Sequence, residues 1–407
     1  MTQRQYKIVV YGASGFTGRL VAEYLNTAYG DAPDVSWAMA GRSVSKLEAV
    51  REEMGISGNV DILAADASDP ASLKAMAESA SVIITTVGPY QLYGEPLLAA
   101  CVEAGTDYVD LCGEPAWMAQ MIVKYQDKAK KSGARIVFSC GFDSVPFDLG
   151  VWFLQREAKA KLGQALPRVK GRVRKMKGTF SGGTAASLTA TLAAVSKDKS
   201  LLKLLTHPFS LTPGFQGPKQ PHSGKAEYDE TAQSWTAPFI MAPINTKNVH
   251  RTNALTGHAY GEDFVYDERM MTGDGPKGEK RAKAAARLEK IQNFMLAMAP
   301  TRWLLKTFML PKPGEGPDRE ARETGFYDIL FIGEGADGES MKASVKGDKD
   351  PGYGSTSKMI SECALCLLLD VGGDKTGGGI WTPGAALGDA LISRLQARAG
   401  LTFAVED

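Results

Sequence analysis

The sequence predicts an α/β protein with a Rossmann-type, doubly wound parallel sheet, an inserted α+β domain, and C-terminal helices that return to the first domain. Short apolar runs alternate with helical patterns over residues 1–150, strand-like segments follow residue 165, and a helical pattern resumes after residue 350. Repeated strand and helix units favour a parallel sheet with helices on both faces. We predict a first domain at 1–160, an inserted domain at 165–348 and a C-terminal helical segment at 350–407.

The strands of the first domain are predicted from six short apolar runs. They span residues 7–11, 35–40, 61–65, 82–87, 108–111 and 135–140. A helix follows the first run, because Phe16, Leu20, Val21, Tyr24 and Leu25 recur at helical spacing and define one apolar face.

The inserted domain is predicted from segments of alternating polarity at 169–176, 264–270, 326–332 and 341–345. Such alternation favours an antiparallel or mixed sheet. A Pro/Gly-rich connection at 208–243 interrupts the pattern, and loops of this length are usually functional or mobile. We interpret this region as a substrate domain. Helical spacing returns after residue 350, and we expect these helices to pack on the first domain.

The composition is that of an ordinary globular protein. The 407 residues are 44% hydrophobic and 23% charged, with 47 basic and 46 acidic side chains, so no whole-chain field attracts nucleic acid. Five cysteines lie mostly in apolar contexts, which favours a reducing compartment over a disulfide framework. The four histidines show no paired metal spacing, and we predict no metal and no nucleic-acid partner.

The sequence favours a cytoplasmic location. Met1 lies too near the first predicted strand for a cleavable signal peptide, and no apolar run approaches the roughly 18 residues of a membrane span. The segment 277–310 is basic and then rich in Met and aromatic residues. It is either a helix that packs between domains or a peripheral contact at the inner face of the membrane. A homodimer is a further hypothesis.

The segment 7–18 runs from a predicted strand through a glycine turn into a predicted helix. Glycines at these positions permit a tight turn, close approach of the backbone to phosphates, and close packing of helix on strand. The helix N-terminus then faces the anion. The spacing is GxxGxxG, and its place between strand and helix predicts a dinucleotide site. The expected cofactor contacts are Gly12, Ser14, Gly15, Phe16, Thr17 and Gly18.

The end of the second predicted strand indicates which dinucleotide binds. An acidic residue there would bind the ribose 2′-hydroxyl of NAD, but this strand ends in Gly41, Arg42 and Ser43. The guanidinium of Arg42 is suited to a 2′-phosphate, and the Ser43 hydroxyl would assist. The sequence therefore favours NADP over NAD, with Arg42 as an ordinary surface cation as the alternative.

Residues after the later strands are also expected to face the cofactor, since ligands lie beyond the carboxyl ends of strands in open α/β sheets. Asp66 either binds the adenine or caps the helix near Pro70. The remaining predicted cofactor contacts are Val87, Gly88, Pro89, Tyr90, Cys112 and Gly113.

The catalytic group is not identified by a motif. No YxxxK, GxSxG or GxxxxGK[ST] pattern supports another chemistry. Tyr90 is the candidate for catalysis, because a phenol is a hydrogen-bond donor at neutral pH; packing or a cofactor contact is the alternative. Asp143 is either a catalytic acid or a helix cap ahead of Pro146. With Ser144, and with Gly182, Gly183 and Thr184 at a glycine-rich helix start, it forms the expected substrate site.

The chain resembles the saccharopine dehydrogenase-like oxidoreductases, and among them the bacterial trans-acting enoyl reductases. The resemblance covers nearly the whole chain. The motifs that carry it are YGASGFTG at 11–18, AGR at 40–42, VGPY at 87–90, DYVD at 107–110 with GE at 113–114, GFDSVP at 141–146, SGGT at 181–184, LPKPGEGP at 310–317, GYG at 352–354 and TPGAALG at 382–388.

The resemblance implies an NADP-dependent reductase of the enoyl reductase type (EC 1.3.1) linked to lipid, glycolipid or polyketide reduction. We expect hydride transfer from NADPH to an activated C=C bond of a small-molecule or acyl-lipid substrate. True saccharopine dehydrogenases act on a C–N bond of an amino-dicarboxylate, and no clear pair of basic residues is placed to clamp one. The alternatives are a saccharopine-type imine or amino-acid dehydrogenase, and a non-catalytic NADP-binding sensor or lipid-docking protein.

Overall fold

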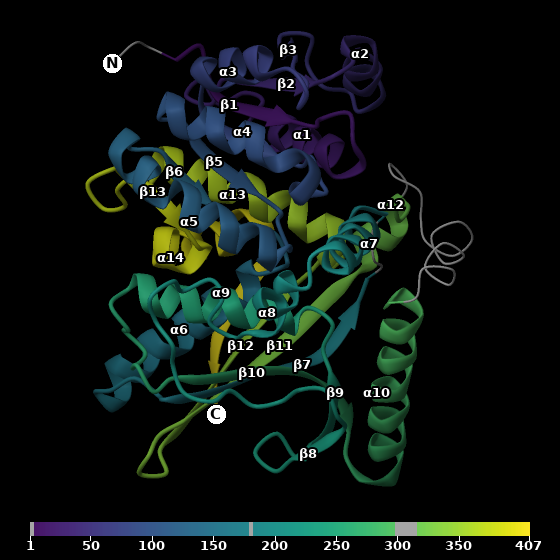
Figure 1. Cartoon of the computed structure of the whole chain (residues 1–407), viewed down its shortest axis with the longest axis vertical. Coiled ribbons are helices and arrows are strands. Elements are labelled where there is room, and N and C mark those ends of the chain that lie inside the picture. Colours follow the sequence, from purple (N-terminus) through teal and green to yellow (C-terminus); the bar gives the residue numbers. More distant parts are fainter. Residues whose placement is uncertain (1–3, 179–181, 298–315) are drawn as a thin grey trace.

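The computed structural model describes residues 4–178, 182–297 and 316–407. Figure 1 shows two sheets, one above the other, with helices packed around and between them. The C-terminal part of the chain contributes one strand to each sheet, β13 to the upper and β14 to the lower. This arrangement agrees with the predicted fold class, a Rossmann-type parallel sheet with a second domain built on a mixed sheet.

The upper sheet has seven parallel strands in the order β13-β6-β5-β4-β1-β2-β3. The strand order changes direction between β1 and β4, which are neighbours, and ligands bind at such switch points in α/β sheets. The strands are β1 (Tyr6–Tyr11), β2 (Trp37–Gly41), β3 (Asp61–Ala64), β4 (Ala80–Thr85), β5 (Asp107–Asp110), β6 (Arg135–Val137) and β13 (Gly379–Trp381).

Helices cover both faces of the upper sheet. Successive side chains of a strand point to opposite faces, so each face has its own buried cluster. On β1, Ile8 and Val10 belong to one buried cluster, which also contains Leu25 of α1; Val9 belongs to a second cluster with Leu73 of α3. The helices of the first face are α1 (Phe16–Tyr29), α2 (Val44–Glu53) and α13 (Thr356–Leu369). Those of the second are α3 (Pro70–Ser79), α4 (Tyr90–Ala104) and α5 (Pro115–Ser132).

The lower sheet is mixed, in the order β14-β12-β11-β7-β10-β9-β8. Only the β7–β10 pair is parallel among these strands. The strands are β7 (Arg168–Lys177), β8 (Glu227–Asp229), β9 (Ser234–Pro238), β10 (Val265–Gly273), β11 (Phe326–Glu334), β12 (Ser340–Gly347) and β14 (Leu401–Glu406).

Helices α6 and α9 lie between the two sheets in Figure 1. One buried cluster continues from Val10 in the upper sheet through Phe147 of α6 to Phe331 of β11, so the two domains share a core. The remaining elements are α6 (Val145–Leu162), α7 (Gly182–Lys197), α8 (Ser200–Thr206), α9 (Ala242–Leu255), α10 (Gly275–Ala297), α12 (Arg319–Thr324), η1 (Pro351–Ser355), α14 (Pro383–Arg394) and η2 (Leu395–Ala399).

The C-terminal segment differs from the helical unit that the sequence predicted. Helix α13 does pack on the first domain, against α1 and β4. The segment also contributes β13 to the upper sheet and β14 to the lower sheet. Leu401 and Phe403 of β14 are buried, and their period of two is the strand signal that the sequence analysis missed.

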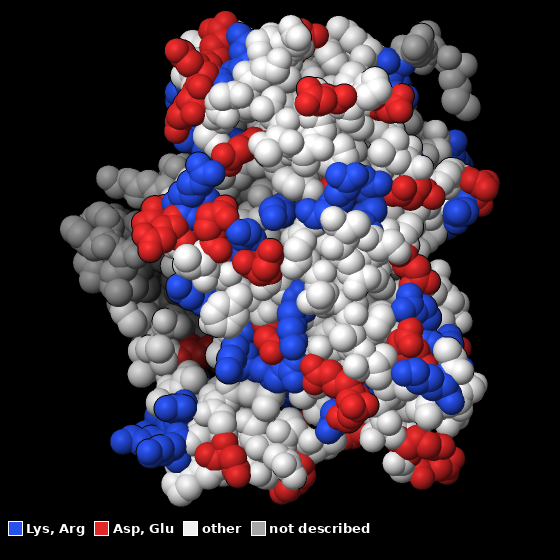
Figure 2. Space-filling view, turned by 180° about the vertical axis from the view of Figure 1, so that it is seen from behind, with Lys and Arg blue, Asp and Glu red and all other residues white. Residues whose placement is uncertain are grey.

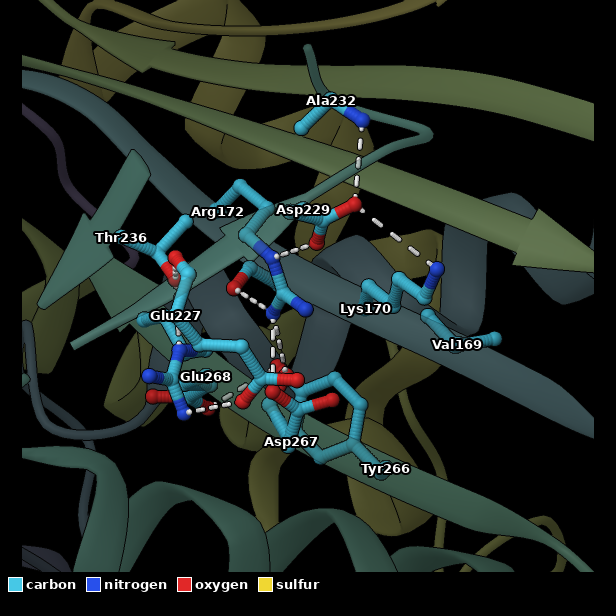
Figure 3. Close-up of polar contacts among 12 residues, drawn as sticks. Val169, Lys170, Arg172, Glu227, Asp229, Ala232, Thr236, Tyr266, Asp267 and Glu268 are labelled. Atoms are coloured by element: carbon cyan, nitrogen blue, oxygen red, sulfur yellow. Dashed lines mark hydrogen bonds and ion pairs between the residues drawn. The ribbon is translucent and has the colours of Figure 1, made fainter. Parts of the chain in front are cut away.

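One face of β7 carries a group of buried and partly buried ion pairs, and Figure 3 shows those that Arg172 makes with Asp229 and Asp267. Arg172 is 3% exposed, and its guanidinium lies between two carboxylates, Asp229 at 2.7 Å and Asp267 at 3.0 Å. Arg168 also pairs with Asp267, and Lys170 pairs with Glu334 at 2.6 Å. These contacts join β7 to strands on both of its sides, and we call them the β7 ion-pair group.

The surface charges do not separate into large patches of one sign on the face shown in Figure 2. Basic and acidic side chains lie interspersed there, in keeping with the net charge of +1.

Candidate dinucleotide and substrate site

The turn between β1 and α1 is too tight for side chains at two of its glycines. Gly12 has φ of +88°, and a Cβ there would lie 2.7 Å from Cγ2 of Val87. A Cβ on Gly18 would lie 2.1 Å from the carbonyl oxygen of Gly12. The Gly15 amide donates to the same oxygen at 2.8 Å and closes the turn. Helix α1 therefore starts directly over the end of β1, as a bound pyrophosphate requires.

The N-terminus of α1 is open to an anion. Its N-cap residue, Gly15, makes no side-chain cap bond, and the first turn holds no acidic residue. The unpaired amides and the helix dipole favour a phosphate there. Ser14, Phe16 and Thr17 flank this position and are partly exposed. The Phe16 ring packs edge-on against Tyr353 of η1 with 4.6 Å between ring centroids, which fixes the helix start beside η1.

Arg42 is a free cation at the end of β2. It is exposed, and it makes no hydrogen bond or ion pair with any residue that the structure describes. Ser43 has a structural role, because its hydroxyl accepts from the Lys46 amide at 3.3 Å and caps α2. An unpaired guanidinium after the second strand fits the 2′-phosphate of NADP.

Asp66 is not the helix cap that one interpretation of the sequence proposed. The cap of α3 is Asp69, which accepts from the Ala71 amide at 3.1 Å. The Asp66 carboxylate instead accepts two bonds from Ser68, from its amide and its hydroxyl, each at 2.8 Å. These bonds, with the nearby charge of Arg42, hold the pKa of Asp66 below its usual value. Asp66 therefore stays charged at the end of β3.

The residues after β4 form the next part of the edge. Val87 and Pro89 are partly exposed and Gly88 is exposed. Helix α7 of the lower domain comes close to them, since a Cβ on Gly88 would lie 3.9 Å from Oγ of Ser187. The structure therefore brings α7 to the ends of the upper strands.

Helix α7 begins at Gly182 and includes Gly183 and Thr184 in its first turn. The side chain of Thr184 and the residues just before the helix lie outside the described part of the chain. The substrate contact predicted for these three residues stays a prediction.

Tyr90 is not suited to be the catalytic donor that the sequence analysis proposed. Its ring is 5% exposed, and its hydroxyl is committed on both sides: it donates to the Thr85 carbonyl at 3.2 Å and accepts from the Leu111 amide at 3.0 Å. Burial raises the pKa of this phenol well above 10. Tyr90 therefore joins the ends of β4 and β5, and we correct its role to a structural one.

The loop after β5 is built around two buried carboxyls. Asp110 accepts from the amides of Cys112 at 3.0 Å and Ser139 at 2.9 Å, and burial raises its pKa to about 7. Glu114 accepts from the amides of Tyr90 and Gln91 at the start of α4, at 2.9 and 2.8 Å. The Asp110 bonds join the ends of β5 and β6, and the Glu114 bonds join the β5 loop to the start of α4.

The two cofactor contacts predicted in this loop have different surroundings. Cys112 is fully buried, so it has no exposed atom to contact a cofactor, and we withdraw that prediction. Gly113 is exposed, and a Cβ there would meet nothing within 4 Å. Its predicted contact is compatible with the structure and stays a prediction.

Asp143 is not the cap of α6. The N-cap is Ser144, which makes no side-chain cap bond. Asp143 is partly exposed, and its carboxyl makes no hydrogen bond with a described residue. Ser144 is fully buried, and its hydroxyl accepts from Nδ2 of Asn248 at 2.8 Å. Ser144 therefore anchors α9 and is not exposed to substrate.

Helix α9 carries polar residues that the sequence analysis missed. Asn245 and Asn248 are fully buried, and Oδ1 of each has no partner among the described residues. Nδ2 of Asn245 donates to Glu268 of β10 at 2.9 Å. The spacing of three residues places both amides on one face of a helix. This spacing alone is a weak indication of a functional site, because the sequence does not show which face of the helix is buried.

Comparison with known proteins places the chain in a family. It is 44% identical, over 97% of this chain and 96% of the relative, to a Mycobacterium tuberculosis protein provisionally named as a trans-acting enoyl reductase. It is 37% identical, with the same coverage, to the trans-acting enoyl reductase of Mycobacterium ulcerans. The chain belongs to the trans-acting enoyl reductase family. The family model for the saccharopine dehydrogenase NADP-binding domain also matches residues 8–137.

Solved structures agree on the fold of this enoyl reductase family member. Saccharopine dehydrogenase (L-Glu forming) of Saccharomyces cerevisiae has a TM-score of 0.54 at 13% identity and covers 99% of this chain and 100% of its own. Homospermidine synthase of Legionella pneumophila, solved with NAD, has a TM-score of 0.55 at 10% identity and covers 99% and 91%. The chain is thus an oxidoreductase of the saccharopine dehydrogenase-like fold with a nicotinamide dinucleotide domain.

Part of the basic segment predicted at 277–310 forms α10, and residues 298–310 lie outside the described chain. Small residues of α10, among them Ala282 and Ala286, are buried, while Leu288 and Ile291 are 56% and 55% exposed. No helix of the described residues is long and apolar enough to cross a membrane. Membrane contact and a homodimer stay predictions.

The described residues of this family member hold no group of three or more His, Cys, Asp or Glu placed for a metal. All five cysteines are free and buried.

Proposed function

We propose that this protein uses NADPH to reduce the activated C=C bond of a lipid-like or polyketide acyl substrate. The observation that carries the proposal is the similarity to trans-acting enoyl reductases, which extends over 97% of the chain and so includes the inserted domain. A dinucleotide domain alone would support any nicotinamide chemistry.

The preference for NADPH is supported by the upper sheet. The amides at the start of α1 would hold the pyrophosphate, and Arg42 would hold the 2′-phosphate. The glycine turn fits this role because its close contacts leave no space for a Cβ at Gly12 or Gly18. The bound NADPH would supply the hydride.

The acceptor is expected beyond the ends of β4, β5 and β6. The predicted contacts in these loops that are exposed or partly exposed are Val87, Gly88, Pro89, Gly113 and Asp143. Helix α7 approaches Gly88 from the lower domain, so an acyl group bound here would contact both domains. Exclusion of water by the second domain would protect the reacting carbons.

The test is turnover of NADPH with a panel of acceptors. We expect NADPH oxidation with 2-enoyl acyl thioesters, with the saturated acyl thioester as product by mass spectrometry. The panel also contains imines formed from amino-dicarboxylates. Turnover on the imines alone would support the saccharopine-type alternative. Tight NADPH binding without oxidation by any acceptor would support a non-catalytic sensor or lipid-docking protein.

A further inference from the structure

We propose that Asp143 is the proton donor of the reaction, acting on the substrate carbon next to the carbonyl group. This inference rests on the proposed function. Asp143 would supply the proton that Tyr90 cannot. Three observations support this: the position of Asp143, the surroundings of its carboxyl group, and the neighbouring polar atoms that lack partners.

The loop that carries Asp143 is held firmly at the carboxyl end of β6. Asp110 of the adjacent strand binds the Ser139 amide at 2.9 Å. The Phe142 amide donates to the Thr356 hydroxyl at 3.0 Å, and the Phe142 ring packs on Tyr327 at 5.0 Å. Asp143 therefore projects from a rigid loop at the edge where ligands bind in parallel sheets.

The Asp143 carboxyl has no structural task in the described chain. It makes no hydrogen bond and does not cap α6. Neighbouring carboxyls differ in this respect: Asp110 and Glu114 each accept two backbone amides. An unbonded, partly exposed carboxyl in an otherwise bonded loop is free to exchange a proton with a ligand.

A second observation marks a ligand position beside it. Asn248 is bonded to Ser144, the next residue after Asp143, yet its buried Oδ1 has no partner among the described residues; the same holds for Asn245. Buried polar atoms are normally paired, so unpaired ones indicate a bound ligand or water. Both amides lie on α9, at the seam between the two sheets.

The surroundings keep the carboxyl protonated near neutral pH. Burial raises the pKa of Asp143 to about 7. The titratable group that faces it is Glu268 of β10, whose own pKa is raised, first by burial and also by the charge of Asp143. Glu268 accepts from Tyr266 and Asn245, both at 2.9 Å. No cation of the described chain pairs with Asp143 to hold it ionised.

The step balances as follows. The hydride adds to the β-carbon and the C=C π bond breaks, so that its electron pair moves toward the α-carbon and carbonyl oxygen. The Asp143 O–H bond then breaks, its proton forms the new C–H bond at the α-carbon, and the carboxylate remains. Solvent then returns a proton to the Asp143 carboxylate. The overall change consumes one NADPH and one proton.

The first test observes Asp143 directly in the protein without substrate. Burial raises the pKa of Asp110 and Asp148 to about 7 as well. In protein labelled with ¹³C at aspartate carboxyls, NMR is therefore expected to show several carboxyls that titrate near pH 7, and one of these signals should be absent from Asp143→Asn. The control is Asp337→Asn, which removes an exposed carboxyl from the β11–β12 turn. If Asp143→Asn keeps every near-neutral carboxyl titration of the wild type, the proposal is wrong.

The second test separates chemistry from binding. We expect Asp143→Asn to lower kcat by about 100-fold or more with unchanged KM and NADPH affinity, and Asp143→Glu to recover part of kcat. Wild-type kcat should fall as pH rises above 7, because the acid must be protonated, and this fall should be absent in Asp143→Asn. An Asn variant with near wild-type kcat and pH profile would refute the role. If wild type reduces no enoyl thioester, the proposed function fails, while the NMR titration still decides the state of Asp143.

Discussion

At the scale of single residues, the proposed preference for NADPH depends on one unpaired cation. Arg42 has no partner in the described chain, so its removal costs the fold little. A charge-assisted bond contributes about 1.5–3 kcal/mol, so Arg42→Ala should weaken NADPH binding by about tenfold to a hundredfold and leave NADH binding unchanged. Titration calorimetry with both dinucleotides measures this. Lys46→Ala, which removes an exposed cation from α2, is the control, and an equal loss in both variants would contradict a specific role for Arg42.

The glycine turn is tested by a change in side-chain size, because its role is to leave room for close packing and not to supply charge. A Cβ at Gly18 would overlap the Gly12 carbonyl, so Gly18→Ala must move α1 away from β1. We expect a loss of about 1–3 kcal/mol in stability and a loss of dinucleotide binding. Gly58→Ala is the matched control, since nothing lies within 4 Å of a Cβ there. Thermal unfolding with and without NADPH measures both effects. If NADPH stabilises Gly18→Ala as much as it stabilises the wild type, the glycine turn does not bind the dinucleotide.

Single residues also show where sequence reasoning stops. The glycines could be predicted because local backbone geometry alone requires them. Tyr90 could not, because its role depends on the Leu111 amide of another strand end. One of the two interpretations of Asp66 was a helix cap, which Asp69, three residues later, provides. A polar side chain that follows a strand indicates the edge of the sheet where ligands bind. Its hydrogen-bond partner, however, comes from a neighbouring strand, and the order of the strands in the sheet cannot be read from the sequence.

At the scale of elements, helix α4 begins on a carboxylate from a different loop. Glu114 binds the first two amides of α4, those of Tyr90 and Gln91, and its charge lies at the positive end of the helix dipole. Glu114→Gln should therefore reduce the free energy of unfolding by about 1–2 kcal/mol. Denaturant unfolding of this variant, beside Glu103→Gln on the exposed side of α4, measures the difference. Equal stabilities of the two variants would show that the charge at the helix start contributes nothing.

The elements differ in how far they could be predicted. Strands of the upper sheet contain short apolar runs and are recognised by composition. Helix α9 was missed because its buried residues include Asn245, Asn248 and Thr252, and a polar helix normally predicts a surface position. Its burial makes sense only once both sheets are in place, since its partners Ser144 and Glu268 come from different domains.

At the scale of the whole molecule, the β7 ion-pair group, part of which Figure 3 shows, joins neighbouring strands of the lower sheet. Burial alone would raise the pKa of Asp229 and Asp267. The charge of Arg172 acts against burial at both residues, with Lys170 and the Ala232 amide at Asp229 and with Arg168 at Asp267, and together these contacts hold both pKa values below the usual value. Groups with lowered pKa stabilise the fold above their unfolded pKa near 4. That stability is lost as pH falls through the lower folded values.

Arg172→Met should therefore do more than remove one contact. It would leave two buried carboxylates without their main partner, and breaking a buried pair costs about 3–5 kcal/mol. The variant should also unfold at a higher pH than wild type on acidification, because Asp229 and Asp267 would protonate sooner. Denaturant unfolding at pH 7 and at acid pH measures both effects, with Arg287→Met on the exposed side of α10 as the control. If Arg172→Met has wild-type stability at pH 7 and the same acid transition, the ion pairs merely occupy the sheet surface, and apolar packing between the sheets holds the two domains together by itself.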